Sequence, residues 1–198
     1  MQYKTTTRLF KGIYKYKIVL VCPGSQHFRH HSHEEIVESL LADTKSKTKE
    51  NLQFALALQN TLNTMENIEV RVENPWISIY TNKETDLNKI TKIGQDCVKY
   101  ISKPSIDLEE GTVLMPKMDF DFRVTLGKTT HEHSAFIEWA KSNSKIKLTK
   151  GCIKDLEKPR SWGGKHFYVK GDKNLMVAKM HLEGAVSKIE RIVKNQTS

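Results

Sequence analysis

The sequence predicts an α+β fold made of two βαββαβ units with antiparallel sheets. Residues 14–21 and 120–127 are the clearest strands, and in the second the side chains alternate with the period of two that a sheet with one exposed face requires. One Ser/Thr-x-x-Glu capping box begins at Ser32 and another at Thr129, which predicts that a helix follows each strand. In both halves a strand, a glycine and a His-x-His precede the first helix, and this repetition indicates a tandem duplication.

The first half supplies one complete unit. Asn74-Pro75 interrupts an alternating stretch, which predicts a hairpin. The apolar stripe of the longest predicted helix consists of Leu52, Ala55, Leu56, Leu62 and Met65. The predicted elements are a strand at 14–21, helices at 34–42 and 52–65, a hairpin at 67–82, a helix at 83–94 and a strand at 97–104. This β-α-β-β-α-β order is that of the ferredoxin-like fold.

The second half repeats this order. Its predicted elements are a strand at 120–127, a helix at 134–143, a strand at 145–150, a helical turn at 152–158, a strand at 165–170, a helix at 172–184 and a closing strand at 186–194. The apolar residues of 186–194 also fit a helical stripe. We therefore predict a ferredoxin-like unit at 1–104, a linker at 105–118 that is rich in proline and acidic residues, and a second ferredoxin-like unit at 119–198.

The composition predicts a folded intracellular protein. Of the 198 residues, 38% are apolar and 28% are charged, which favours a globular chain over a disordered one. The longest apolar run, residues 18–22, is too short to cross a bilayer, and the basic N-terminus lacks the apolar stretch of a secretory signal. Three cysteines without a CxxC spacing indicate reduced thiols. We therefore predict a cytoplasmic protein without a membrane partner, and its bias toward lysine, asparagine and isoleucine is typical of an AT-rich viral or bacterial genome.

The net charge of +9 is distributed unevenly along the chain. Residues 1–33 contain six basic and no acidic side chains, and residues 141–173 contain ten basic and three acidic ones. Residues 34–110 contain nine basic and fourteen acidic side chains. Two positive blocks around an acidic middle favour a surface that faces a polyanion, whereas the alternative is a lysine-rich solvated surface. The acidic middle, 34–110, is the candidate segment for binding a basic protein or a second copy of the chain.

The segment 141–173 carries the strongest functional pattern, because it combines cations with aromatic residues and the pair Gly163-Gly164. Lysines neutralise phosphates without choosing a sequence, and an exposed aromatic ring stacks on an unpaired base. Trp162 is therefore either exposed, where its ring can stack on a base, or buried in the hydrophobic core. The predicted nucleic-acid-binding residues are Lys15, Lys17, Arg29, Lys141, Lys145, Lys147, Lys150, Lys154, Arg160, Trp162, Lys165, His166 and Lys170.

Histidines gather before the first helix, at His27, His30, His31 and His33. A transition metal needs several imidazoles that converge on one point, whereas these lie in a loop, so we predict no metal site and no cofactor. An imidazole can transfer the protons that RNA backbone cleavage requires, which makes His31 and His33 the candidate catalytic residues. The alternative to catalysis is that these histidines only form the polar segment before the helix and contact phosphate or solvent. His131 and His133 are placed to contact phosphate at the positive end of the second unit's helix.

The tandem order with an early histidine resembles the repeat-RNA-processing endoribonucleases of CRISPR systems. Trp162-Gly163-Gly164 does not match their glycine-rich loop, so the resemblance is one of fold alone. Phosphate-binding, dinucleotide-binding, zincin and serine-hydrolase motifs are absent. We expect a non-enzymatic protein that binds nucleic acid through two lysine-rich segments on a common face. RNA or single strands are the expected ligands in preference to duplex DNA. The alternatives are a metal-independent endoribonuclease and an assembly or adaptor protein.

Overall fold

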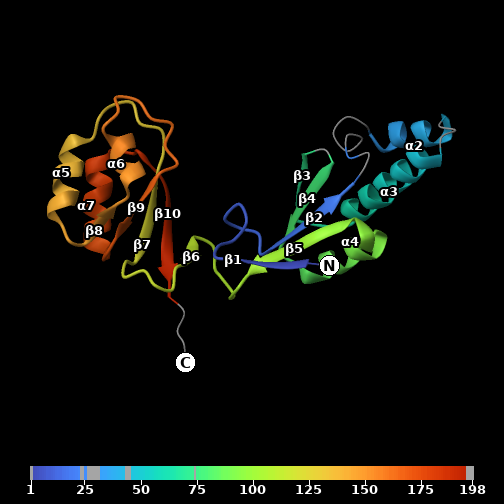
Figure 1. The fold of residues 1–198 in the computed structure, drawn as a ribbon, viewed down its shortest axis with the longest axis horizontal. Helices are drawn as coiled ribbons and strands as arrows, with labels where there is room; N and C mark the ends of the chain where they lie inside the picture. The colour runs from blue at the N-terminus through green and yellow to red at the C-terminus, as the bar shows by residue number, and fades with distance from the viewer. Residues whose placement is uncertain (1, 23–24, 26–31, 43–45, 74, 195–198) are drawn as a thin grey trace. The chain divides into compact units, whose positions relative to one another are not determined.

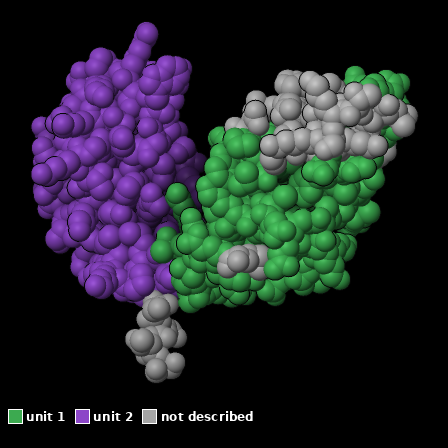
Figure 2. Space-filling view, turned by 45° about the vertical axis from the view of Figure 1, so that its right-hand side comes forward, with its two compact units in different colours: residues 1–108 green, residues 109–198 purple. Residues whose placement is uncertain are grey.

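The computed structural model describes residues 2–22, 25, 32–42, 46–73 and 75–194. The chain divides into two compact units, residues 1–108 and residues 109–198, which are green and purple in Figure 2. The division falls inside the segment 105–118 that was predicted as a linker. Each unit contains a five-stranded sheet with helices, so the prediction of an α+β fold is confirmed.

Unit 1 is built on a sheet with the strand order β1-β5-β2-β4-β3 (Figure 1). Neighbouring strands are antiparallel except at the edge, where β1 lies parallel to β5. The elements are β1 (Gln2–Thr6), β2 (Tyr16–Val21), α2 (His33–Ala42), α3 (Ser46–Asn63), β3 (Glu69–Glu73), β4 (Trp76–Thr81), α4 (Glu84–Ile93), η1 (Gln95–Cys97) and β5 (Val98–Pro104).

The core of unit 1 lies between one face of this sheet and the helices α3 and α4. Strand residues such as Ile18 and Ile79 pack there against Leu58 of α3 and Ile90 of α4. The cross-strand register places Ile18, Ile79 and Ile101 on this face, and it places Lys17, Tyr80 and Ser102 on the opposite face. We call the face that points away from the helices the open face of the sheet.

Unit 2 has the corresponding strand order β6-β10-β7-β9-β8. Here β6 lies parallel to β10, and the other neighbouring pairs are antiparallel. The elements are β6 (Thr112–Leu114), β7 (Phe122–Leu126), α5 (Ser134–Ser142), β8 (Ile146–Leu148), α6 (Lys150–Leu156), β9 (His166–Val169), α7 (Asp172–Leu182) and β10 (Val186–Val193).

The core of unit 2 follows the same plan. Val124 and Phe167 on the sheet pack against Phe136 of α5, Leu156 of α6 and Leu182 of α7. The open face of this sheet carries a smaller apolar cluster, in which residues that precede β7 in the sequence pack against three buried residues. Its members are Val113, Tyr168 and Ile192, with Met115, Met118 and Phe120 packed against them.

Two expectations about the fold need correction. The sheets are mixed rather than antiparallel, because β1 and β6 each add a parallel edge strand that the sequence did not indicate. The second capping box is also wrong, since α5 begins only at Ser134 while Thr129 forms a backbone bridge with Ser161. The first capping box is confirmed, because Ser32 N–H donates to Glu35 Oε2 (2.6 Å) and Glu35 N–H donates to Ser32 Oγ (3.3 Å). The closing element, 186–193, is a strand and not a helix.

Candidate functional site

The lysine-rich segment 141–173 lies entirely in unit 2, where it runs from the end of α5 to the start of α7. Its exposed predicted cations are Lys141, Lys145, Lys147, Lys150, Lys154, Arg160 and Lys165. Lys170 differs from these, because it is half-buried and its Nζ lies 2.7 Å from Oδ2 of Asp119. That ion pair lowers the pKa of Asp119 and occupies the ammonium of Lys170 within the unit.

These cations do not share one surface. Lys147 lies opposite Tyr168 on the open face of the sheet. Lys150 and Lys154 belong to α6, which packs on the other face through Leu156. The structure does bring Lys165 toward α6, since a Cβ built on Gly151 would lie 3.4 Å from Cδ of Lys165. The candidate site is therefore the helix α6 together with the loop that follows it.

This loop, residues 157–165, is anchored to the end of β7, and we call it the Trp162 loop. Gly164 N–H donates to the carbonyl of Leu126, and Leu126 N–H donates to the carbonyl of Lys165, both at 2.8 Å. Thr129 and Ser161 exchange two further backbone hydrogen bonds of 2.9 and 3.1 Å. The loop thus has a defined backbone, although it contains neither helix nor strand.

Gly163 allows this close approach. Its φ is +76°, and a Cβ at this position would lie 2.2 Å from the carbonyl oxygen of Gly127. The left-handed backbone and the contact both require glycine. The glycine pair was predicted to let the backbone approach a ligand, whereas Gly163 approaches the protein's own strand.

Trp162 points away from the protein. Its side chain is 90% exposed, so it does not plug the core. The ammonium of Lys128 lies 5.2 Å from the centre of the indole ring, within the range of a cation–π contact. Lys158 and Arg160, in the same loop, are also exposed. A largely exposed ring thus has one cation beside it and two more in its loop, and rings combined with cations in this way bind bases together with their phosphates.

Among the predicted residues of unit 1, the structure describes Lys15 and Lys17. Lys15 Nζ lies 2.6 Å from Oδ1 of Asp107, and this hydrogen-bonded pair raises the pKa of Lys15. Lys17 lies on the open face with its Nζ 5.5 Å from the ring centre of Tyr80. Tyr16 packs against the core under the helices, so the lysine side of β2 is the side that faces away from them.

The remaining predicted residues of unit 1 fall outside the described part of the chain. Arg29 and His31 belong to the range 26–31, which is outside the described residues. His33 is the first residue of α2, but its side chain is not among those described. The catalytic role predicted for His31 and His33 therefore stays a prediction.

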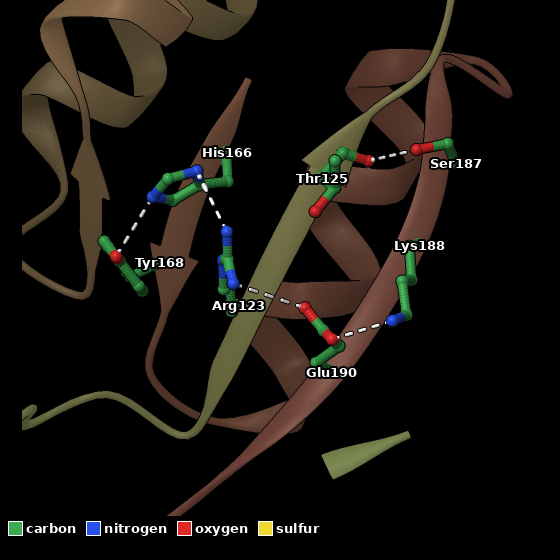
Figure 3. Close-up of polar contacts among 7 residues, drawn as sticks. All are labelled: Arg123, Thr125, His166, Tyr168, Ser187, Lys188 and Glu190. Atoms are coloured by element: carbon green, nitrogen blue, oxygen red, sulfur yellow. Dashed lines mark hydrogen bonds and ion pairs between the residues drawn. The ribbon is translucent and has the colours of Figure 1, made fainter. Parts of the chain in front are cut away.

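A polar network crosses the open face of the unit 2 sheet (Figure 3). Nε2 of His166 lies 3.1 Å from the hydroxyl of Tyr168, and its Nδ1 lies 3.4 Å from Nη2 of Arg123. Arg123 Nη1 lies 3.7 Å from Oε2 of Glu190, whose other oxygen lies 2.8 Å from Nζ of Lys188. Glu190 is only 2% exposed, so two cations compensate a buried carboxylate.

This geometry requires a neutral imidazole at His166. Arginine can only donate hydrogen bonds, so Nδ1 must accept from Arg123 and Nε2–H donates to Tyr168. Burial and the positive charge of Arg123 lower the pKa of His166, with the carboxylate of Glu190 acting in the opposite direction. His166, which was predicted to contact nucleic acid, thus belongs to an internal network.

The phosphate contact expected of His131 and His133 stays a prediction, and the structure shows how the two rings lie. His133 is the N-cap residue of α5 and only 5% exposed, and its ring centre lies 4.4 Å from that of His131. Burial lowers the pKa of His133, and the neighbouring His131 lowers it further. His133 is thus buried at the start of α5, whereas His131 is exposed.

The structure also reveals residues that the sequence did not single out. Lys128 lies beside Trp162, although 34 positions separate them in the sequence. On the open face of unit 1, Lys4 lies 4.0 Å from the ring centre of Tyr100, and Lys99 lies 3.4 Å from that of Trp76. Each of these contacts depends on strand register or on loop anchoring, so local sequence contains no signal for them.

Comparisons with protein-family models, with curated proteins and with solved structures give no significant match. None of the helices whose residues are described has the length and apolar character needed to span a membrane. Within the same part of the chain, no three His, Cys, Asp or Glu side chains are grouped as metal ligands would be. Residues 1–33 belong to unit 1 and 141–173 to unit 2, so the convergence of the two basic blocks on a common face stays a prediction.

Proposed function

We propose that the chain binds single-stranded nucleic acid, RNA or DNA, through α6 and the Trp162 loop of unit 2. The observation that carries this proposal is the indole of Trp162, which is 90% exposed in a well-anchored loop with Lys128 beside it. Folding gains little from a ring in this position, because its cation–π contact with Lys128 is an exposed one. An unpaired base gains from the ring, because stacking on an aromatic side chain contributes about 1–3 kcal/mol per base.

The surrounding charge supports a polyanionic ligand. Among the exposed cations of α6 and the loop, Lys158 has a carboxylate within 4 Å, since its Nζ lies 3.7 Å from Oδ1 of Asp155. Flexible lysines such as Lys150 and Lys165 neutralise phosphates and release counterions without reading the sequence. Single strands are favoured over duplexes, because only an unpaired base presents its whole face to the ring.

We also infer that the two units are ferredoxin-like domains related by duplication. When β1 and β6 are left aside, the orders β5-β2-β4-β3 and β10-β7-β9-β8 are equivalent, and every neighbouring pair is antiparallel. A parallel edge strand precedes this core in both units. The shared addition supports a common origin better than the core order does, because the core order recurs in many unrelated proteins.

The proposal is tested by measuring how a fluorescently labelled uridine oligomer binds to the full chain in a series of salt concentrations. For the wild type, the logarithm of the affinity should fall linearly with the logarithm of the salt concentration. Trp162→Ala should weaken binding about 5- to 150-fold, the equivalent of about 1–3 kcal/mol. Lys165→Gln should reduce the salt slope by about 0.7.

The matched control is Met180→Ala. Met180 is also a large apolar residue of unit 2, 71% exposed, but it lies on α7 outside the basic segment. Its replacement should leave both the affinity and the salt slope unchanged. An affinity that does not respond to salt, or equal losses in Trp162→Ala and Met180→Ala, would refute the proposal.

A further inference from the structure

The open face of the unit 1 sheet carries aromatic rings with lysine ammonium groups above them. Lys4 Nζ lies 4.0 Å from the ring centre of Tyr100, and Lys99 Nζ lies 3.4 Å from that of Trp76. Both rings are half-buried, and both lysines are exposed. Such pairs are cation–π contacts at the surface of the sheet, not parts of the core.

Strand register places the two rings on one platform. Tyr100 lies opposite Val19 of the central strand β2, and Trp76 lies opposite Val21 of the same strand. The two residues thus flank β2 on the strands β5 and β4, and two strand spacings with the two-residue offset along β2 put their Cα atoms about 12 Å apart. Val19 and its other neighbour Ser78 are buried, so the platform between the rings is closely packed.

We propose that this face of unit 1 is a second binding surface for single-stranded nucleic acid, on which bases stack against Tyr100 and Trp76 while Lys4 and Lys99 contact phosphates. The inference rests on the proposed function for its class of ligand, but it concerns other residues in the other unit. A β-sheet with exposed aromatic rings is an established way to stack unpaired bases.

On each ring, a base that displaces the lysine ammonium forms a more favourable contact than the one it replaces. A cation–π contact at an exposed site contributes a factor of about two to five, whereas stacking of a base contributes about 5- to 150-fold. Lysine has a long flexible stem, so the displaced ammonium remains close enough to neutralise the phosphate of the same nucleotide. Ring and cation therefore both keep a partner after binding.

The acidic side chains of this face lie on the edge strand β3 and are compensated there. Glu73 Oε1 lies 2.6 Å from Nη2 of Arg71, and Glu69 pairs with Lys11. Tyr80 lies opposite Glu69, and Phe10 and Tyr14 pack against the ring of Tyr80. The accessible positive charge therefore lies toward β5, where Lys4 and Lys99 are.

The experiment uses the three tryptophans of the full chain as separate reporters. Trp139→Phe/Trp162→Phe leaves Trp76, and Trp76→Phe/Trp139→Phe leaves Trp162. Each protein is titrated with a single-stranded uridine oligomer, and the matched RNA duplex serves as a second ligand. We expect the single strand to quench Trp76, and the duplex to quench it far less.

Tyr100→Ala in the Trp76-only protein should weaken the binding reported by Trp76 about 5- to 150-fold. The matched control is Tyr3→Ala, because Tyr3 is 64% exposed on the same sheet but lies opposite Ile101, on the helix side. Circular dichroism verifies that both variants are folded. If Tyr100→Ala unfolds the chain, Lys4→Gln should still reduce the affinity and the salt slope.

The outcomes separate the two proposals. Quenching of Trp162 without quenching of Trp76 overturns this inference and leaves the proposed function standing. Quenching of Trp76 alone, with an affinity lost in Tyr100→Ala and kept in Tyr3→Ala, supports the inference and overturns the role of Trp162. If neither tryptophan responds to the oligomer, both proposals fail. Equal losses in Tyr100→Ala and Tyr3→Ala also overturn the inference.

Discussion

Gly163 is the residue whose replacement tests most directly how the Trp162 loop is held. In Gly163→Ala the new Cβ would lie 2.2 Å from the carbonyl oxygen of Gly127 and 2.7 Å from that of Leu126. The neighbouring variant Gly164→Ala is a matched control. Gly164 also has a left-handed backbone, with a φ of +83°, but a Cβ there would meet nothing within 4 Å.

The two variants share one cost and differ in another. An alanine in the left-handed region costs about 1–2 kcal/mol, and this should be the whole effect of Gly164→Ala. In Gly163→Ala the loop must also move away from β7, which breaks the 2.8 Å hydrogen bond from Gly164 N–H to Leu126. A backbone group left unsatisfied costs about 1–3 kcal/mol, so the difference between the variants should have this size.

Urea unfolding followed by circular dichroism measures the free energy of unfolding of each variant. Hydrogen exchange locates the change, because the amides of Leu126 and Gly164 should lose protection in Gly163→Ala and keep it in Gly164→Ala. Binding of the uridine oligomer should fall in Gly163→Ala as well, since the ring of Trp162 loses its position. Equal stabilities for the two variants, with the Leu126 amide still protected in both, would refute the account of the loop.

Two further predictions concern titratable groups. Burial raises the pKa of Cys22 and of Cys152 to about 12, and it raises the pKa of the half-buried Cys97. A thiol reagent at about pH 8 should therefore modify Cys97 first and the other two only after unfolding, so rapid modification of all three thiols would contradict these burials. The folded structure lowers the pKa of His166 and of His133 from 6.5. At a pH between the folded and the unfolded pKa of each histidine, the unfolded chain therefore binds more protons than the folded one. Stability present above about pH 6.5 should be lost as the pH falls below it. Urea midpoints measured across this range should show a smaller loss in His166→Gln, and an equal loss would exclude His166 as a cause.

The elements of the fold were predictable where each strand shows its own pattern. The alternation over residues 120–127 corresponds to β7, and the hairpin at 67–82 corresponds to β3 and β4. The edge strands β1 and β6 were not predictable. Residues 2–5 are exposed, so no apolar alternation marks them, and β6 has only three residues. Both are held by backbone pairing with a strand from the far end of their unit.

The candidate site was predictable in composition but not in geometry. The sequence located the cations of 141–173, yet it left Trp162 open between the core and the surface, and the anchoring of its loop to β7 decides between them. His166 was assigned to the interface because it lies among lysines. In the structure His166 contacts Arg123 and Tyr168, and Arg123 in turn contacts Glu190. These residues become neighbours through the register of β9, β7 and β10, which no local pattern contains.

The two open faces explain why each unit is expected to bind through a different part of its surface. Equivalent central strands place Val19 opposite Tyr100 in unit 1, and Arg123 opposite Glu190 in unit 2. In unit 2 the buried Glu190 compensates Arg123 and Lys188, so a phosphate gains little there, and breaking such a pair is costly. In unit 1 the ammonium groups of Lys4 and Lys99 lie over the neutral rings of Tyr100 and Trp76, and a ring does not cancel a positive charge as a carboxylate does. Under the two proposals, unit 1 would bind a polyanion through its sheet, and unit 2 would bind one through the Trp162 loop.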